Sequence, residues 1–408
     1  MSDASPSRDS SSELPLVGEP LTQEAHRARA IFFLAAAVAC MGVCMAIQGG
    51  LNENFVVLEM KVTGLQRGIL ESSRESCGIM ALGVLALLAG FAEPLVGMFM
   101  LMLVGIGCGA YALVHGYGWL VAASMVWSMG LHVWMPLPNS MTIAIAEPGK
   151  IGHRLGQLQA AGAAGTGAGL VAAIALTFAG VPMRPLYVVS GAFAFLAAFM
   201  LFSIPRRIKT PGPRVVLRRK FGLYYLLCLL EGWRKQISIC FAPFLLVKVF
   251  GTPLWAMLVL AMAVQGVGYL ASPPVGRLID RIGERRVLLF YYSGLAMFFV
   301  AYAFVPNVGV LYAVFIVDSA FFVFGMSLTT YVGRIADRSE LTPTLSMGVA
   351  MNHVAAVAMP LVGGLLWKLG YRWLFLTGVV AAAFSIFAAL RVPKRRPAEA
   401  QGPRTSTA

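Results

Sequence analysis

The sequence predicts an all-α membrane protein with twelve transmembrane helices in two six-helix halves. First, 58% of the 408 residues are hydrophobic and 12% are charged, whereas soluble proteins carry about 25% charged residues. Second, apolar runs recur along the chain, each long enough to cross a hydrocarbon core of ~30 Å as a helix. Third, the longest polar break, PRRIKTPGPRVVLRRK at 205–220, divides these runs six and six.

The expected spans follow one another with short connections. They lie near 30–55, 65–91, 95–115, 118–146, 155–179 and 184–204, and then near 221–249, 253–275, 286–305, 308–336, 344–369 and 372–392. The halves are therefore 30–204 and 221–392, joined by a basic cytoplasmic linker at 205–220. The N-terminal tail, 1–29, is polar and rich in Ser and Pro, so we expect it to be disordered. The C-terminal tail is 393–408.

The net charge of +14 follows the expected topology, so it does not indicate a nucleic-acid partner. Lys and Arg gather in the tails, the linker and the connections on the same side. The few basic residues expected on the opposite side are Lys61, Arg67, Arg184, Lys248, Lys368 and Arg372. This asymmetry is the positive-inside pattern, which predicts a multi-pass inner- or plasma-membrane protein with both termini cytoplasmic. The six cysteines lie in apolar runs, so no disulfide framework is expected.

The two halves repeat weakly. MGLHVWMPLPNSMTIAIAE (129–147) can be placed over AFFVFGMSLTTYVGRIAD (320–337), with Met135 over Met326 and Glu147 over Asp337. Each segment is the expected fourth span of its half. Internal repeats around a central site are how many secondary transporters are built.

The segment GRLIDRIGERR (276–286) resembles the loop signature of the major facilitator superfamily, which joins the second and third helices of a half. LVGGLLWKLGYRWLFL (361–376) also resembles that superfamily's junction between helices 11 and 12. The resemblance implies the superfamily's twelve-helix fold and a gating role in which charged loop residues tie neighbouring helix ends. The residues that match are Gly276, Asp280, Arg281, Gly283, Arg285 and Arg286.

The first half departs from this signature. It reads LALLAGFAEPLVGMFML (86–102), without the Asp, the Arg or the basic pair, and carries Glu93 before Pro94. We expect either that one half alone holds the gate or that Glu93 substitutes in part.

Charged residues occur within two expected spans, where ionisable groups are costly and commonly serve transport or proton relay. They are Glu71, Arg74 and Glu75 in the second span and Glu231, Arg234 and Lys235 in the seventh. In each group, residues at i, i+3 and i+4 share a helix face. We expect the cations to bind an anionic or hydrogen-bond-rich substrate, and Glu75 or Glu231 to carry a coupling proton. The alternative is structural ion pairing that joins helices.

Isolated polar residues within spans are weaker candidates. Asp318 is a lone acid in the tenth span that either carries a proton or pairs helices. The uncharged or titratable candidates for hydrogen bonds to substrate are Gln48, Asn52, His132, Asn139, Asn352 and His353. The alternative for each is a hydrogen bond between helices.

Together these observations predict a secondary active transporter, monomeric and proton-coupled as a symporter, that moves a small polar or anionic organic solute by alternating access. No enzyme activity, cofactor or resident metal is expected, because no nucleophile or metal-ligand spacing appears. Three alternatives stay open. One is a multidrug or hydrophobic-cation exporter, and one is a membrane receptor or sensor. The third is a soft-metal, copper-type transporter, suggested by Cys40 with Cys44 and by Met347 with Met351.

Overall fold

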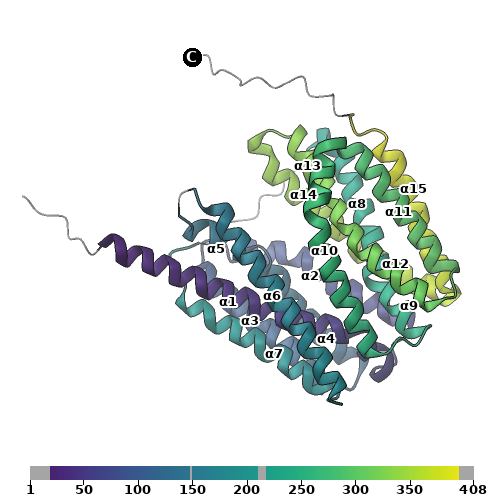
Figure 1. The fold of residues 1–408 in the computed structure, drawn as a ribbon, viewed down its shortest axis with the longest axis horizontal. Helices are drawn as coiled ribbons and strands as arrows, with labels where there is room; N and C mark the ends of the chain where they lie inside the picture. Colours follow the sequence, from purple (N-terminus) through teal and green to yellow (C-terminus); the bar gives the residue numbers. More distant parts are fainter. Residues whose placement is uncertain (1–18, 148, 210–216, 395–408) are drawn as a thin grey trace, which may run out of the picture.

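The computed structural model describes residues 19–147, 149–209 and 217–394, and these form helices with no β-strand among them. Two helical bundles, one from each half of the sequence, meet along one side (Figure 1). They diverge toward the end of the molecule where α1 begins and α15 ends. The predicted all-α fold in two six-helix halves is confirmed.

Six membrane spans form the N-terminal half. The first is α1 (Glu19–Asn54), which continues into a π-helical turn at Phe55–Glu59. The others are α2 (Gly64–Leu87), α3 (Glu93–Ala110), α4 (Tyr117–Trp134) with α5 (Leu137–Ile145), α6 (Ile151–Phe178) and α7 (Met183–Met200). Pro136 and Pro138 explain the break between α4 and α5, because proline lacks the N–H group that a helix interior requires.

The C-terminal half repeats this plan. Its first span is α8 (Gly222–Gln236), a π-helical turn at Ile237–Phe241 and α9 (Ala242–Lys248). The others are α10 (Leu254–Ile282), α11 (Glu284–Phe304), α12 (Val308–Phe321) with α13 (Met326–Ile335), α14 (Arg338–Leu369) and α15 (Tyr371–Ala389). Both halves therefore break their fourth span and place a π-helical turn in their first.

Ten helices among the described residues are long and apolar enough to cross a membrane, which makes the chain an integral multi-pass membrane protein. The two expected spans that fail this criterion are α2 and the continuous α8–α9 segment. These two spans carry the charged residues predicted from the sequence, and these residues lower their mean hydropathy.

Two boundaries differ from the sequence prediction. Helix α1 begins at Glu19, within the tail expected to be disordered to residue 29, and residues 1–18 lie outside the described part. Helix α10 continues to Ile282, so most of the segment 276–286 is helical and its prediction as a loop was wrong. The connection to α11 is Gly283, whose φ of +81° lies in a region that favours glycine.

Helices α2 and α14 form the main contact between the halves, and glycines bring their backbones close. A Cβ atom on Gly68 would lie 2.1 Å from the Pro360 carbonyl oxygen, and small residues permit such close packing. The Ser72 hydroxyl donates to the Val357 carbonyl oxygen across this contact (2.7 Å). Near the α1–α2 connection, the Asn54 amide donates to the Thr252 carbonyl oxygen (3.0 Å). The halves are therefore joined at the end opposite to the one where they diverge.

Candidate functional site

A cavity of about 270 Å³ lies between the two halves. Helices α1, α2 and α4 contribute Gln48, Arg74 and Trp127 to its wall, among others. The C-terminal half contributes Ile239, from the turn between α8 and α9, and Phe315 of α12. A site shared by both halves is where transporters built from repeats hold their substrates.

The π-helical turns of the first span in each half adjoin this cavity. In the N-terminal half, the turn at 55–59 begins two residues after Glu53, which lines the cavity together with Asn52. In the C-terminal half, the turn at 237–241 contains Ile239. Such turns interrupt regular helix geometry and are frequent at functional sites.

A chain of alternating charges lies beside the cavity in the N-terminal half. The Arg67 guanidinium donates to both Glu53 oxygens, from Nε (3.2 Å) and Nη2 (2.7 Å), and through Nη1 to Glu71 Oε2 (2.7 Å). Arg74 Nη2 donates to the other Glu71 oxygen. The Arg67 and Glu71 side chains are 1% and 0% exposed. Two cations and two carboxylates balance, as buried charges require.

The prediction for Arg67 was wrong. The sequence placed it outside the membrane, on the opposite side from the termini, whereas the structure buries it between helices. It is buried because its planar guanidinium can bind two carboxylates at once. Glu71 and Arg74 share a helix face as predicted, whereas the predicted partner Glu75 takes no part in this chain of charges. Glu53 was missed. The signal that could have found Arg67 is its i, i+4 spacing from Glu71.

The cavity wall holds polar groups whose hydrogen bonds are incomplete. Both amide atoms of Gln48 and the Oδ1 atom of Asn52 are buried without a partner on any described residue. Arg74 stacks on Trp127, with its guanidinium carbon 5.2 Å from the ring centroid, and keeps 17% of its side chain exposed. Leaving a buried polar atom unpaired costs about 1–3 kcal/mol. These groups are therefore suited to a polar ligand.

The charged residues of the seventh span have a different environment. Arg234 Nη2 donates to Glu231 Oε2 (2.7 Å), and its guanidinium carbon lies 4.1 Å from the centroid of the Tyr292 ring. The Tyr291 hydroxyl donates to Glu231 Oε1 (2.8 Å). Lys235 is exposed and makes no ion pair with a described residue. None of the three charged residues lines the cavity. The contacts of Glu231 and Arg234 with the two tyrosines instead hold α8 against α11, which is the structural alternative.

Asp318 is the isolated acid of the C-terminal half. Its side chain is 1% exposed and accepts a hydrogen bond from the Tyr302 hydroxyl (3.2 Å), and it has no cationic partner among the described residues. It lies one helical turn from Phe315 of the cavity wall. Asn352 instead donates to the Cys228 carbonyl oxygen (3.4 Å), which is a bond between helices. Asn139 is exposed on α5, away from the cavity lining.

Glu75, His132 and His353 come together from α2, α4 and α14. Glu75 Oε2 lies 3.4 Å from His353 Nδ1. The two imidazole ring centroids are 5.4 Å apart. These residues are distant along the chain, so their spacing in the sequence gives no sign of a cluster. The structure places them in one cluster that includes both halves.

The gating segment lies at the ends of α10 and α11. Asp280 and Arg281 are exposed in the last turns of α10, and Arg285 and Arg286 begin α11. An ion pair near these helix ends joins Glu284 of α11 to Arg334 of α13, at 3.2 Å between Oε2 and Nη2. The gating role of the predicted residues stays a prediction.

Glu93 occupies the equivalent position in the N-terminal half. It begins α3, is fully buried and accepts a hydrogen bond from the Ser140 hydroxyl of α5 (2.6 Å). The register that places Met135 over Met326 also places Glu93 over Glu284. Each acid thus joins the third span of its half to the second part of the fourth span. This arrangement supports a partial substitution by Glu93.

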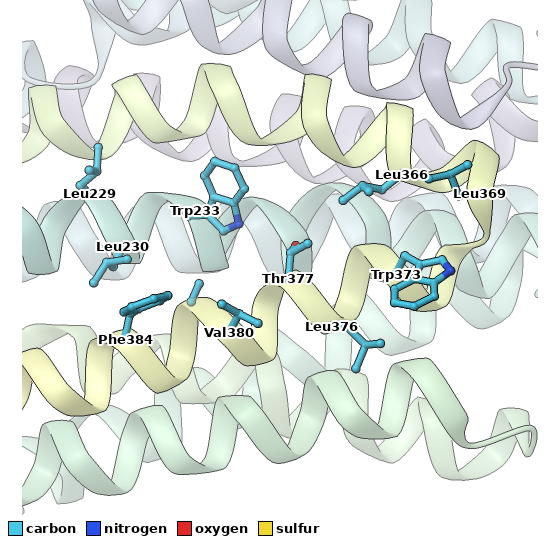
Figure 2. Close-up of a pocket in the computed structure, with 11 residues that line it drawn as sticks. Leu229, Leu230, Trp233, Leu366, Leu369, Trp373, Leu376, Thr377, Val380 and Phe384 are labelled. Carbon is cyan, nitrogen blue, oxygen red and sulfur yellow. The ribbon is translucent and has the colours of Figure 1, made fainter.

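A second, larger cavity of about 650 Å³ lies outside the bundle on α8, α14 and α15 (Figure 2). Its lining is apolar except for Thr377 and the indole N–H groups of Trp233 and Trp373. Several of the lining side chains are exposed on the apolar outer surface, including Leu369 at 74%. None of the candidate polar or charged residues lines it. This lining therefore offers no site for a polar or anionic solute.

Comparison with known proteins supports the same fold. Residues 269–408 match the family model of the Major Facilitator Superfamily. A mutant of the nucleoside transporter NupG has a similar structure, with a TM-score of 0.73 at 13% identity, covering 90% of this chain and 100% of that one. The D-xylose-proton symporter gives 0.68 at 13% identity, covering 90% and 98%.

A bacterial homologue of the iron transporter ferroportin, in an inward-facing state, gives a TM-score of 0.72 at 13% identity, covering 89% and 98%. No curated protein sequence matches this chain. The resemblance to the major facilitator superfamily is confirmed, and the chain has that superfamily's transporter fold. Identities this low describe the fold alone.

Proposed function

We propose that this protein is a secondary active transporter that moves a small polar or anionic organic solute across the membrane by alternating access. The observation that carries this proposal is the cavity between the halves. There the unpartnered amide of Gln48 and the partly exposed guanidinium of Arg74 face one space. A volume of about 270 Å³ favours a small solute, since drug-sized ligands occupy cavities of about 300–1,000 Å³.

The solute is recognised chiefly by hydrogen bonds. The charge of Arg74 is already balanced by Glu71. Arg74 therefore contributes hydrogen-bond donors to the solute and little net positive charge. Gln48 adds a donor and an acceptor, and Asn52 adds an acceptor. Trp127 supplies an apolar surface beside them. This combination favours a solute with several oxygen or nitrogen atoms over a hydrophobic cation.

Proton coupling is assigned to Asp318. Glu231 is held by Arg234 and Tyr291 in the described conformation, whereas Asp318 has no cation beside it. An unpaired charge inside a membrane protein is costly, so a carboxyl group in such a place is suited to carrying a proton. The two halves diverge at the end of the molecule where α1 begins and α15 ends. The basic residues indicate that both termini are cytoplasmic, so this conformation opens toward the cytoplasm.

The test is a thermal-shift screen of the detergent-purified full chain with pools of organic acids, amino acids, sugars, nucleosides and cationic drugs. A ligand at 100 times its Kd stabilises the folded state by about 2.7 kcal/mol. We expect a polar or anionic solute to raise the melting temperature of the wild type and of the control Lys235→Ala. The same solute is expected to have no effect on Gln48→Leu or Arg74→Lys.

Two results would contradict the proposal. One is stabilisation by hydrophobic cations alone. The other is equal stabilisation of the wild type, Gln48→Leu and Arg74→Lys by the same solute, since a solute in this cavity must contact these side chains. Uptake of the hit compound into proteoliposomes then separates a transporter from a receptor that binds without flux.

A further inference from the structure

We propose that Glu75, His132 and His353 form a binding site for a divalent transition-metal ion that bridges the two halves. Glu75 and His132 belong to the N-terminal half, on α2 and α4, and His353 belongs to α14 of the C-terminal half. One carboxylate oxygen and one nitrogen from each ring lie within 4.8 Å of one another. This site goes beyond the proposed transport of an organic solute and uses no residue that the solute is proposed to contact.

The distances fit a site that closes slightly around its ion. Zinc binds imidazole nitrogen at about 2.0–2.1 Å and carboxylate oxygen at about 2.0–2.2 Å, so two ligand atoms lie at most about 4.2 Å apart. Glu75 and His353 are already at 3.4 Å. Because the ligand atoms all lie within 4.8 Å of one another, the site reaches these distances when α2, α4 and α14 approach slightly.

The orientation of His132 is fixed by a hydrogen bond of the kind that metal-binding histidines make. Its Nδ1 atom donates to the Ser128 carbonyl oxygen, one turn earlier on α4 (2.8 Å). The Nε2 atom therefore keeps its lone pair for an ion. A carbonyl partner on the other ring nitrogen sets the tautomer and the direction of a histidine ligand. The Ser128 hydroxyl in turn donates to the Arg74 carbonyl oxygen (2.8 Å), which ties α4 to α2.

Gly78 leaves the space in which the two rings meet. It lies on α2, nearly one turn after Glu75. A Cβ atom there would lie 2.5 Å from His353 Cε1 and 3.0 Å from His132 Cδ2. Any other residue at this position would displace the rings. The absence of a side chain is thus a condition for the cluster.

The ligand set selects the class of metal. Two imidazoles and one carboxylate suit Zn²⁺, Co²⁺, Fe²⁺ or Mn²⁺, whereas Cu⁺ favours thiolate and thioether ligands. The nearby Cys77 thiol points instead to the carbonyl oxygens of Ser73 and Met125. Three protein ligands leave a coordination position open, as in zinc sites that exchange a bound molecule.

An ion held by residues of both halves stabilises the conformation in which they are adjacent. Helices α2 and α14 must separate for the molecule to open at its joined end, and the ion would oppose that separation. Bound metal should therefore slow the transport cycle.

The test is isothermal titration of Zn²⁺ into the purified full chain. We expect about one equivalent to bind in the wild type. We expect Glu75→Gln, His132→Asn and His353→Asn each to weaken the affinity more than about 10-fold, since loss of a mere hydrogen-bond partner of a ligand costs about 10–100-fold. The matched control is His115→Asn, because His115 lies in the α3–α4 connection, away from the cluster.

Titration of Co²⁺ followed by its visible absorption gives a second readout, because the band reports nitrogen and oxygen ligands directly. If one of the three variants fails to fold, the other two still test the site. Unchanged Zn²⁺ affinity in His132→Asn and Glu75→Gln would overturn the proposal. A loss of binding in His115→Asn equal to that in the cluster variants would overturn it as well. Neither result depends on any organic solute, so the proposed function is tested separately.

Discussion

Replacing Arg67 tests whether the buried chain of charges holds the N-terminal half together. The Arg67 side chain is 1% exposed and makes three hydrogen bonds, two to Glu53 and one to Glu71. Arg67→Met would leave Glu53 without a cation and Glu71 with Arg74 alone. Removing one partner of a buried ion pair costs about 3–5 kcal/mol, because the remaining charge stays buried.

This free energy converts to a measurable shift in melting temperature. Unfolding entropy is about 2 cal/mol/K per residue, so the loss over the 408 residues amounts to a decrease of about 4–6 °C by that scaling. The assay is differential scanning fluorimetry of the detergent-purified protein at one fixed scan rate, since large proteins unfold irreversibly. The melting temperature of Arg67→Lys should lie between those of the wild type and Arg67→Met, because one ammonium group cannot bind two carboxylates in the bidentate manner of Arg67.

The matched control is Arg154→Met. Arg154 also bonds a carboxylate twice, that of Glu147, at 3.0 and 2.5 Å, but both side chains are partly exposed at 19% and 17%. Exposed ion pairs contribute little to stability. If Arg67→Met lowers the melting temperature no more than Arg154→Met does, the reasoning about buried charge is wrong. Recovery of stability in the double variant Arg67→Met, Glu53→Gln, which keeps the Arg74–Glu71 pair, would confirm that the unpaired Glu53 carboxylate causes the loss.

Three further predictions concern the transport cycle. Asp318→Asn should abolish accumulation driven by a pH gradient in proteoliposomes while preserving solute exchange, because the amide cannot carry a proton; intact gradient-driven accumulation would exclude Asp318 as the carrier. Gly68→Ala should separate α2 from α14, because its methyl group would lie 2.1 Å from the Pro360 carbonyl oxygen; an unchanged distance between spin labels on these helices would contradict this. Asp280→Asn should change the balance of conformations without changing substrate preference, and identical labelling of cysteines introduced at the ends of α10 and α11 in variant and parent would argue against a gating role.

The sequence by itself determined the membrane class, the division into halves and the position of nearly every span. These features depend on local composition: twenty or so apolar residues specify a membrane helix wherever they occur. The prolines that break the fourth span of the N-terminal half, and the repeat that aligns Glu93 with Glu284, are also readable along the chain. The resemblance at 276–286 indicated the superfamily's fold, which the structure confirms, although the residues of this segment are mostly helical.

Only the tertiary structure decided what the charged residues contact. The two patches on the second and seventh spans look alike in sequence, yet Arg74 lines the cavity and Arg234 lies against Tyr291 and Tyr292 instead. Helical spacing gives the face that a residue shares with its neighbours. It does not give the direction in which that face points, because that depends on how each helix is rotated against the others.

Distance along the chain hid the remaining features. Glu53 and Arg67 belong to different spans, and their pairing depends on the angle at which α1 meets α2. Glu75, His132 and His353 come together only because α14 of one half packs against α2 of the other, with Gly78 leaving room for both rings. Packing between helices determines which distant residues become neighbours. A single sequence shows which side chains are available but not which of them come into contact.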